Sequence, residues 1–127
     1  MIPTQALLKV SDNSGGKVVR CLKILKKGSS PRYGFVGDVI VASVQSIRSK
    51  NKLTSKVKKG DVVFAVIVKT KAPLRRSTGI SFKFSYNSVV LLTRQKRPLA
   101  SRIFGIIPKE LRSKKFSKIV SLSSGVV

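Results

Sequence analysis

The residues that could do chemistry in this chain are a few acids and many bases. It has no histidine, the commonest general base at neutral pH, and 4 acids stand against 27 lysines and arginines. Asp12, Asp38 and Asp61 lie beside Gly, Asn or Val in turn-like sequence, where a carboxylate usually accepts a backbone hydrogen bond. Glu110 follows Pro108 at a predicted helix start. The sequence therefore does not favour an enzyme.

Cofactor and metal chemistry also lack the residues they need. Gly15-Gly16 precedes a predicted strand, and no G-x-x-x-x-G-K-[ST] phosphate loop occurs. Cys21 is the single cysteine, which excludes an internal disulfide, and we interpret it as a small buried strand residue. A carboxylate metal site needs at least two converging acids. We expect no cofactor, no metal and no small-molecule substrate.

The basic residues predict an anionic partner. With a net charge of +23, the chain repels itself unless nucleic acid, an anionic membrane or an acidic protein surrounds it. A solvated face explains most charge runs, but here four groups share one sign with almost no acid between them. Lysine and arginine release counterions from phosphates, which favours nucleic acid. A membrane partner is not expected, because no basic amphipathic helix, no apolar run of about 20 residues and no secretory signal is recognised.

The central third of the chain must position these charges. A Gly60-Asp61 turn precedes Val62 to Val68, an unbroken apolar run typical of a strand buried on both faces. A basic connector, Lys69 to Gly79, follows. Ile80 to Tyr86 then alternates apolar and polar residues like a strand with one buried face. With Val89 to Leu92, this predicts three consecutive strands and a basic arm projecting between the first two.

The remaining strand signals predict the fold class. Ala6 to Val10, Val18 to Leu25, and Val39 to Val44 after a second Gly-Asp turn bring the total to about five. That pattern favours a mainly β protein built on a small closed antiparallel barrel. We expect one domain over residues 1–127, with a barrel core at about 1–95. Residues 96–127 form a tail, with up to two short helices between Pro108 and Leu122.

Three aromatic residues could read bases. Phe82, Phe84 and Tyr86 alternate with polar residues and could form a stacking platform on an open sheet. Packing in the core is the explanation we favour for them. The sequence therefore predicts a protein that wedges into folded RNA through backbone contacts, rather than a sequence-specific reader of single strands.

Long stretches spread over the whole chain carry a family resemblance. They are Ser11-Asp12-Asn13-Ser14-Gly15, Val36-Gly37-Asp38-Val39-Ile40, Val57-Lys58-Lys59-Gly60-Asp61-Val62, Ala65 to Val68 with Arg75-Arg76, Gly79, Phe84, Asn87 and Val90-Leu91, Ser101 to Gly105, Pro108 to Arg112, and Phe116 to Leu122. With these motifs, the chain resembles the universal large-subunit ribosomal protein fourteen family in its bacterial and organellar form. The resemblance implies a five-stranded barrel, a projecting β-ribbon and a tail of short helices.

The resemblance also implies a function and partners. It implies a structural constituent of the large ribosomal subunit that binds large-subunit rRNA and neighbouring ribosomal proteins and helps form a bridge to small-subunit rRNA. We expect an rRNA set at Lys9, Lys17, Lys50, Lys52, Lys56, Lys58, Lys59, Lys69, Lys71, Arg75, Arg76, Arg94 and Lys96. We expect a bridge set at Arg97, Ser101, Arg102, Lys109, Arg112, Lys114, Lys115 and Lys118. The alternative is a free-standing cationic protein that coats nucleic acid.

Further expectations concern the tail, the tip of the ribbon and the origin of the protein. Ile103, Phe104, Leu111 and Ile119 either cap the open end of the barrel or join an apolar patch for a neighbouring protein. Thr78 stands where the family usually has Asp, Asn or Ser, so the tip of the ribbon differs. The excess of Lys and Ser and the scarcity of acids favour an organellar, mitochondrial product, with plastid and bacterial origins left open.

Overall fold

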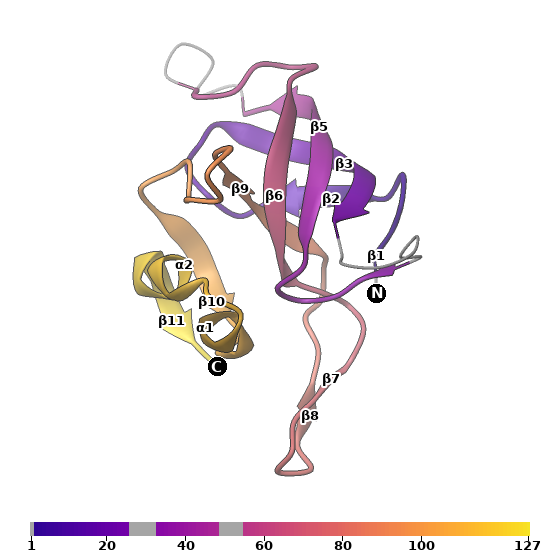
Figure 1. Cartoon of the computed structure of the whole chain (residues 1–127), viewed down its shortest axis with the longest axis vertical. Coiled ribbons are helices and arrows are strands. Elements are labelled where there is room, and N and C mark those ends of the chain that lie inside the picture. Colours follow the sequence, from indigo (N-terminus) through magenta and orange to yellow (C-terminus); the bar gives the residue numbers. More distant parts are fainter. Residues whose placement is uncertain (1, 26–32, 49–54) are drawn as a thin grey trace.

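A closed barrel of five strands forms the centre of the computed structural model, which describes residues 2–25, 33–48 and 55–127 (Figure 1). In order around the barrel, the strands are β2 (Leu7–Val10), β3 (Gly16–Leu25), β5 (Val39–Ile47), β6 (Val62–Lys69) and β9 (Ser88–Leu92). The predicted fold class is confirmed. The strands β3 and β5 are longer than the sequence pattern indicated.

One strand pairing in the barrel is parallel. Each barrel strand runs antiparallel to the next barrel strand in the sequence. Strands β2 and β9 close the barrel in parallel, with Lys9 opposite Ser88 and Val10 opposite Val89. An odd number of alternating strands brings the first and the last into the same direction. The parallel pair is thus the geometric consequence of closing five strands into one sheet.

The other elements form three small units around the barrel. Strands β1 (Ile2–Pro3) and β4 (Tyr33–Gly34) pair with each other, and β7 (Leu74–Arg75) and β8 (Ser81–Phe82) form an arm that projects away from the barrel (Figure 1). The tail contains β10 (Ile103–Ile107), α1 (Glu110–Ser113), α2 (Ser117–Leu122) and β11 (Ser123–Val126). The two short helices were predicted, whereas the parallel pairing of β10 with β11 was not.

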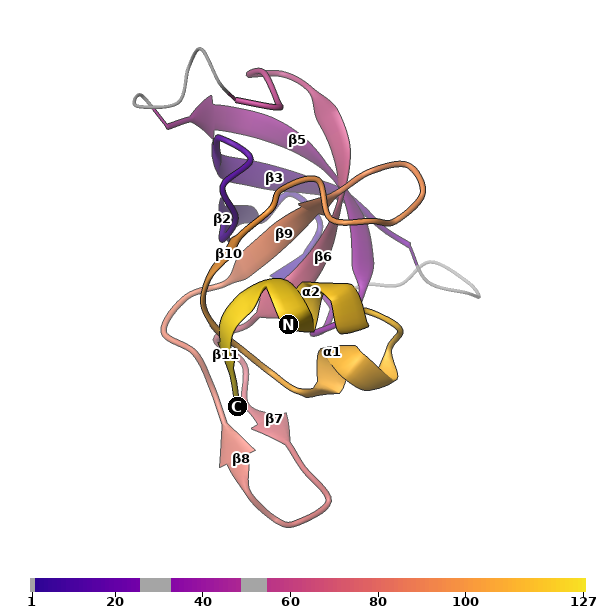
Figure 2. The same ribbon diagram turned by 90° about the vertical axis from the view of Figure 1, so that its left-hand side faces the viewer.

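Strand β9 and the part of β6 from Ala65 onward are buried on both faces, as their unbroken apolar runs predicted, whereas Val62 at the start of β6 is exposed. Ala65 and Ile67 of β6 belong to the core inside the barrel, and Val66 and Val68 belong to a second core outside it. The tail covers this outer face, and both helices lie in front of the barrel in the turned view (Figure 2). The same two strands therefore hold the barrel closed and dock the tail.

Three of the four tail residues named above are buried against the barrel. Ile103, Leu111 and Ile119 are at most 3% exposed and pack on the outer face of β6 and β9. Phe104 is 44% exposed, so the alternative in which all four residues cap the open end of the barrel is wrong. It follows Ile103 on strand β10, where successive side chains point to opposite faces.

The prediction of a barrel strand over Ile80 to Tyr86 is wrong. Only Ser81–Phe82 is a strand, and it pairs with β7 in the arm, while β6 pairs directly with β9. Phe82, Phe84 and Tyr86 are half-buried, and neither core cluster contains them. The alternation is real, but the half-buried aromatic side chains lie beside Arg76 and Lys69 and not in the core that we favoured for them.

Two matching turns precede β5 and β6. Gly37 and Gly60 both have positive φ angles, 88° and 91°, which favour glycine. In each turn the next residue accepts a backbone N–H from three residues earlier: Asp38 from Phe35 at 2.7 Å and Asp61 from Lys58 at 2.8 Å. The predicted role of both acids in turns is confirmed.

Asp12 holds the turn between β2 and β3, the first turn, against the barrel by hydrogen bonds. Its Oδ1 accepts the backbone N–H and the hydroxyl of Ser14 at 3.1 and 2.5 Å, and its Oδ2 accepts the N–H of Leu91 at 3.0 Å. Burial raises the pKa of Asp12, and these hydrogen bonds and the charge of Arg48 offset only part of that effect. Ionisation of Asp12 therefore costs stability as the pH rises above the unfolded value of 3.8.

Burial on both faces predicts a position-dependent effect along β6. Val66→Thr keeps the shape but buries a hydroxyl at a fully buried site, so it should lower the free energy of unfolding by about 1–3 kcal/mol. The control Val62→Thr, at a site that is 63% exposed, should change it by less than about 0.5 kcal/mol. Denaturant unfolding measures both, and equal losses would contradict double burial of β6.

The two acceptor oxygens of Asp12 predict that an amide cannot replace the carboxylate. Asp12→Asn turns an NH₂ group toward one of the donors, so at neutral pH it should cost about 1–3 kcal/mol even though it removes a buried charge. Asp61→Asn is the control, because the exposed Asp61 accepts from Lys58 through one oxygen that an amide retains. Thermal unfolding compares the two, and a stabilised Asp12→Asn variant would show that charge burial outweighs the hydrogen bonds.

Candidate nucleic-acid interface

Most of the rRNA set lies on the surface. Nine of its members are exposed: Lys9, Lys17, Lys56, Lys58, Lys59, Lys71, Arg75, Arg94 and Lys96. Lys50 and Lys52 lie outside the described residues. The two remaining members, Lys69 and Arg76, differ from the expectation because each is engaged inside the protein.

Lys69 is buried at the root of the arm. The side chain is 3% exposed, and its Nζ donates to the Tyr86 hydroxyl at 2.9 Å. The ammonium also lies 5.0 Å from the centroid of the Tyr86 ring, and a Cβ on Gly105 would come within 2.6 Å of it. Lys69 therefore lies close to Gly105 of β10 and is not placed to contact phosphate in this structure.

Arg76, which was expected to contact rRNA, is instead paired with an acid. Its Nε and Nη2 donate to Glu110 Oε1 and Oε2 at 2.6 and 3.3 Å. Nη2 also donates to the main-chain oxygen of Val127, and the guanidinium lies 4.4 Å from the centroid of the Phe82 ring. Arg76 thus joins the arm to the tail.

The electrostatics of Glu110 agree with this pairing. Partial burial alone raises the pKa of this carboxyl. The hydrogen bonds from Arg76, together with a backbone N–H and the charges of Arg76 and Lys109, outweigh burial and hold the pKa below its ordinary value. Glu110 therefore stays ionised at neutral pH and contributes stability that is lost as the pH falls through its lowered value.

The bridge set is entirely exposed. All eight members, from Arg97 to Lys118, present their side chains to solvent. Ser101 is also tied to the first turn, because its backbone N–H donates to Asn13 Oδ1 at 3.1 Å. The fold brings Lys114 and Lys115 close to Lys96 of the rRNA set around an open hollow of about 690 Å³.

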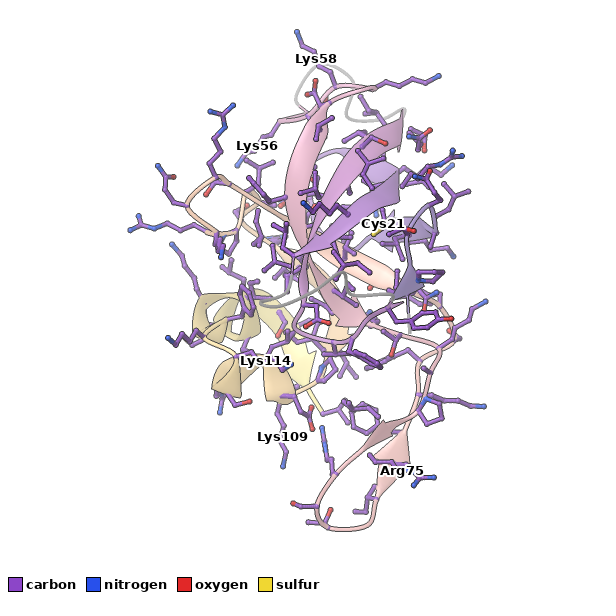
Figure 3. The ribbon with its side chains drawn as sticks, turned by 45° about the vertical axis from the view of Figure 1, so that its right-hand side comes forward. Cys21, Lys56, Lys58, Arg75, Lys109 and Lys114 are labelled. Carbon is purple, nitrogen blue, oxygen red and sulfur yellow. The ribbon has the colours of Figure 1, made fainter. Side chains whose placement is uncertain are left out.

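The exposed cations cover the whole length of the molecule instead of forming one patch. Figure 3 shows Lys56 and Lys58 at one end of the barrel, Lys109 and Lys114 on the tail, and Arg75 on the arm. The elements responsible are the turn before β6, the α1 helix with its flanks, and strand β7. Such a distribution suits a partner that surrounds the protein rather than a ligand in a cleft.

Lys83 is an exposed cation that the predicted sets omit. It lies on the return leg of the arm, between the half-buried Phe82 and Phe84. The signal was present in the sequence, since strict alternation puts Lys83 opposite the aromatic side chains. Only the assignment of this segment to the arm shows that Lys83 shares its surface with Arg75.

The described part of the chain has no cluster of metal-ligating side chains and no helix able to span a membrane. Within residues 2–25, 33–48 and 55–127, no group of three acidic, cysteine or histidine side chains converges to hold a metal. Cys21 is fully buried, and burial raises the pKa of its thiol, which makes it unreactive. None of the described helices is long and apolar enough to span a bilayer.

A protein-family comparison covers the whole chain. The family model described as ribosomal protein L14p/L23e matches residues 1–127, which is the whole chain. Members of this family are structural proteins of the large ribosomal subunit and not enzymes. The chain therefore belongs to the ribosomal protein L14p/L23e family.

Proposed function

We propose that this protein binds large-subunit rRNA chiefly through the phosphate backbone. The observation that carries the proposal is that the acids are engaged within the protein while most of the rRNA set is exposed. All four acids make hydrogen bonds within the protein, three in turns and one with Arg76. The exposed members of the rRNA set therefore have few internal anions to neutralise them, and phosphates supply that charge with release of counterions.

The aromatic residues support backbone contacts over base reading. Phe82 and Phe84 pack edge-to-face, with ring centroids 5.8 Å apart, and are half-buried on the arm. A stacking platform needs open ring faces. The arm therefore contributes charge and shape to RNA binding, and we expect little sequence preference from it.

Salt dependence tests the proposal. Binding of the full chain to large-subunit rRNA of its source should weaken steeply with salt, by about 0.7–0.9 units of log K per unit of log salt for each phosphate neutralised. Changing Lys56, Lys58 and Lys59 together to Gln should make the slope shallower by roughly 2–3. The matched Lys→Arg variant should keep it. A flat wild-type slope would show that phosphate neutralisation does not drive binding. Sedimentation away from the large subunit, with duplex DNA bound as tightly as rRNA, would favour the nucleic-acid-coating alternative.

We also propose that the exposed cations of the tail contact the small subunit. Leu111 is buried in the second core, while its neighbour Arg112 is exposed, so α1 is amphipathic in spite of its length. The buried side of the tail fixes the helices, and the exposed side presents Arg112, Lys114 and Lys115 together. A rigid cationic face on a large-subunit protein suits a bridge to small-subunit rRNA.

Subunit joining tests the bridge. Changing Arg112 and Lys115 to Glu should leave incorporation into large subunits unchanged and lower the fraction of joined ribosomes, more strongly as salt rises. The control exchanges the two residues as Arg112→Lys and Lys115→Arg, which keeps the charge. Gradients at several magnesium and salt concentrations give the joined fraction. Failed incorporation of the reversed variant would instead place these residues against large-subunit rRNA.

The composition supports a mitochondrial ribosome as the location. Acids are nearly absent while lysine and serine are abundant. Tracing the chain through fractionated organelles to their large subunits distinguishes this location from a plastid or bacterial one.

A further inference from the structure

The two legs of the arm have matching patterns of exposure. On the outgoing leg, Lys71, Pro73 and Arg75 are exposed and Ala72, Leu74 and Arg76 are half-buried. On the return leg, Ser81, Lys83 and Ser85 are exposed and Phe82, Phe84 and Tyr86 are half-buried. An alternation of period two on both legs means that the arm has two chemically different faces.

The strand register assigns side chains to those faces. Leu74 lies opposite Phe82, and Arg75 lies opposite Ser81. Residues directly opposite each other share a face of an antiparallel pair. The inner face therefore carries Leu74, Arg76, Phe82 and Phe84, and the outer face carries Arg75 and Lys83.

The inner face is held against the tail. Arg76 makes the forked contact with Glu110 of α1, reaches the main-chain oxygen of Val127 beyond β11, and covers the ring of Phe82. Both charged partners are partly buried, with 17% and 26% of their side chains exposed. Binding a phosphate through Arg76 would first break this set of contacts and leave Glu110 without its partner.

The outer face has no such engagement. Within the described residues, neither Arg75 nor Lys83 makes an ion pair, and both are exposed. Figure 3 shows Arg75 on the side of the arm turned away from the helices. The two adjacent arginines, equivalent in sequence, thus differ in their surroundings.

We propose that these arginines have separate functions. The outer face, with Arg75 and Lys83, is the surface of the arm that binds the RNA backbone, and Arg76 is a positioning residue that braces the arm against the tail through Glu110. This assignment rests on the proposed rRNA binding. The brace fixes the angle at which the outer face meets the RNA, so less ordering is needed on binding.

Neutral variants separate the two functions in the full chain. The probe is large-subunit rRNA of the source, titrated over a series of salt concentrations. Arg75→Gln and Lys83→Gln should each make the salt slope shallower by about 0.7–0.9, because each removes one phosphate contact. Arg76→Gln should keep the wild-type slope and weaken binding by roughly three- to tenfold at every salt concentration.

Glu110→Gln gives the sharpest contrast. It makes the chain more positive, so a purely electrostatic account predicts tighter RNA binding. If Glu110 braces the arm through Arg76, Glu110→Gln should instead weaken RNA binding, by about as much as Arg76→Gln does. The charge swap of Arg76→Glu with Glu110→Arg, which leaves the net charge unchanged, should recover part of the lost affinity.

Hydrogen exchange of the free protein reports on the brace without RNA. Three backbone amides of the arm report on it: those of Arg76, Gly79 and Phe84, which donate to the carbonyl oxygens of Ile80, Arg76 and Thr70 respectively. They should exchange faster in Arg76→Gln and Glu110→Gln but not in Arg75→Gln. Tighter binding by Glu110→Gln, or unchanged exchange in both brace variants, overturns the proposal. A flat wild-type salt slope overturns rRNA binding through phosphates instead, while the exchange measurement still decides the brace.

Discussion

Burial of β6 and β9 on both faces is the constraint on which the rest of the structure depends. Ile67 and Leu91 fill the barrel, while Val66 and Val90 require a cover outside it. The tail supplies that cover and is thereby fixed to the barrel. The arm is the connection between the same two strands, so its root is set by their pairing. Barrel, tail and arm thus share one pair of strands, and a polar group introduced there disturbs all three.

The scarcity of acids is the second constraint. A net charge of +23 works against a compact chain. The few carboxylates reduce the repulsion between cations at points where separate segments meet. Asp12 joins the first turn to Leu91, and Glu110 joins the tail to the arm. The other two close the turns before β5 and β6. Each acid is therefore used inside the protein, which leaves the exposed cations for an anionic partner.

Local pattern was enough to predict the barrel but not the contacts between distant segments. The unbroken run Val62 to Val68 implied burial on both faces, which is confirmed from Ala65 onward but not at Val62. The repeated Gly-Asp pairs implied matching turns, which are confirmed. The alternation of Ile80 to Tyr86 was recognised, yet period two does not say which neighbour covers the buried side. Likewise, Lys69 and Arg76 look like solvent-facing cations until Gly105 and Glu110, which lie more than thirty residues further along the chain, are placed beside them. The charges of the arm could be counted from the sequence, but their division between two faces required the fold.

The contact between Arg76 and Glu110 links two surfaces that could otherwise act independently. Helix α1 has four residues, too few to be stable alone. Two of its side chains hold it in place: Leu111 packs in the second core, and Glu110 pairs with Arg76 of the arm. Arg112, proposed for the bridge, lies on the same short helix and takes its position from them. The arm and the bridge cations therefore share these contacts, which connect the surface proposed for large-subunit rRNA to the surface proposed for the small subunit.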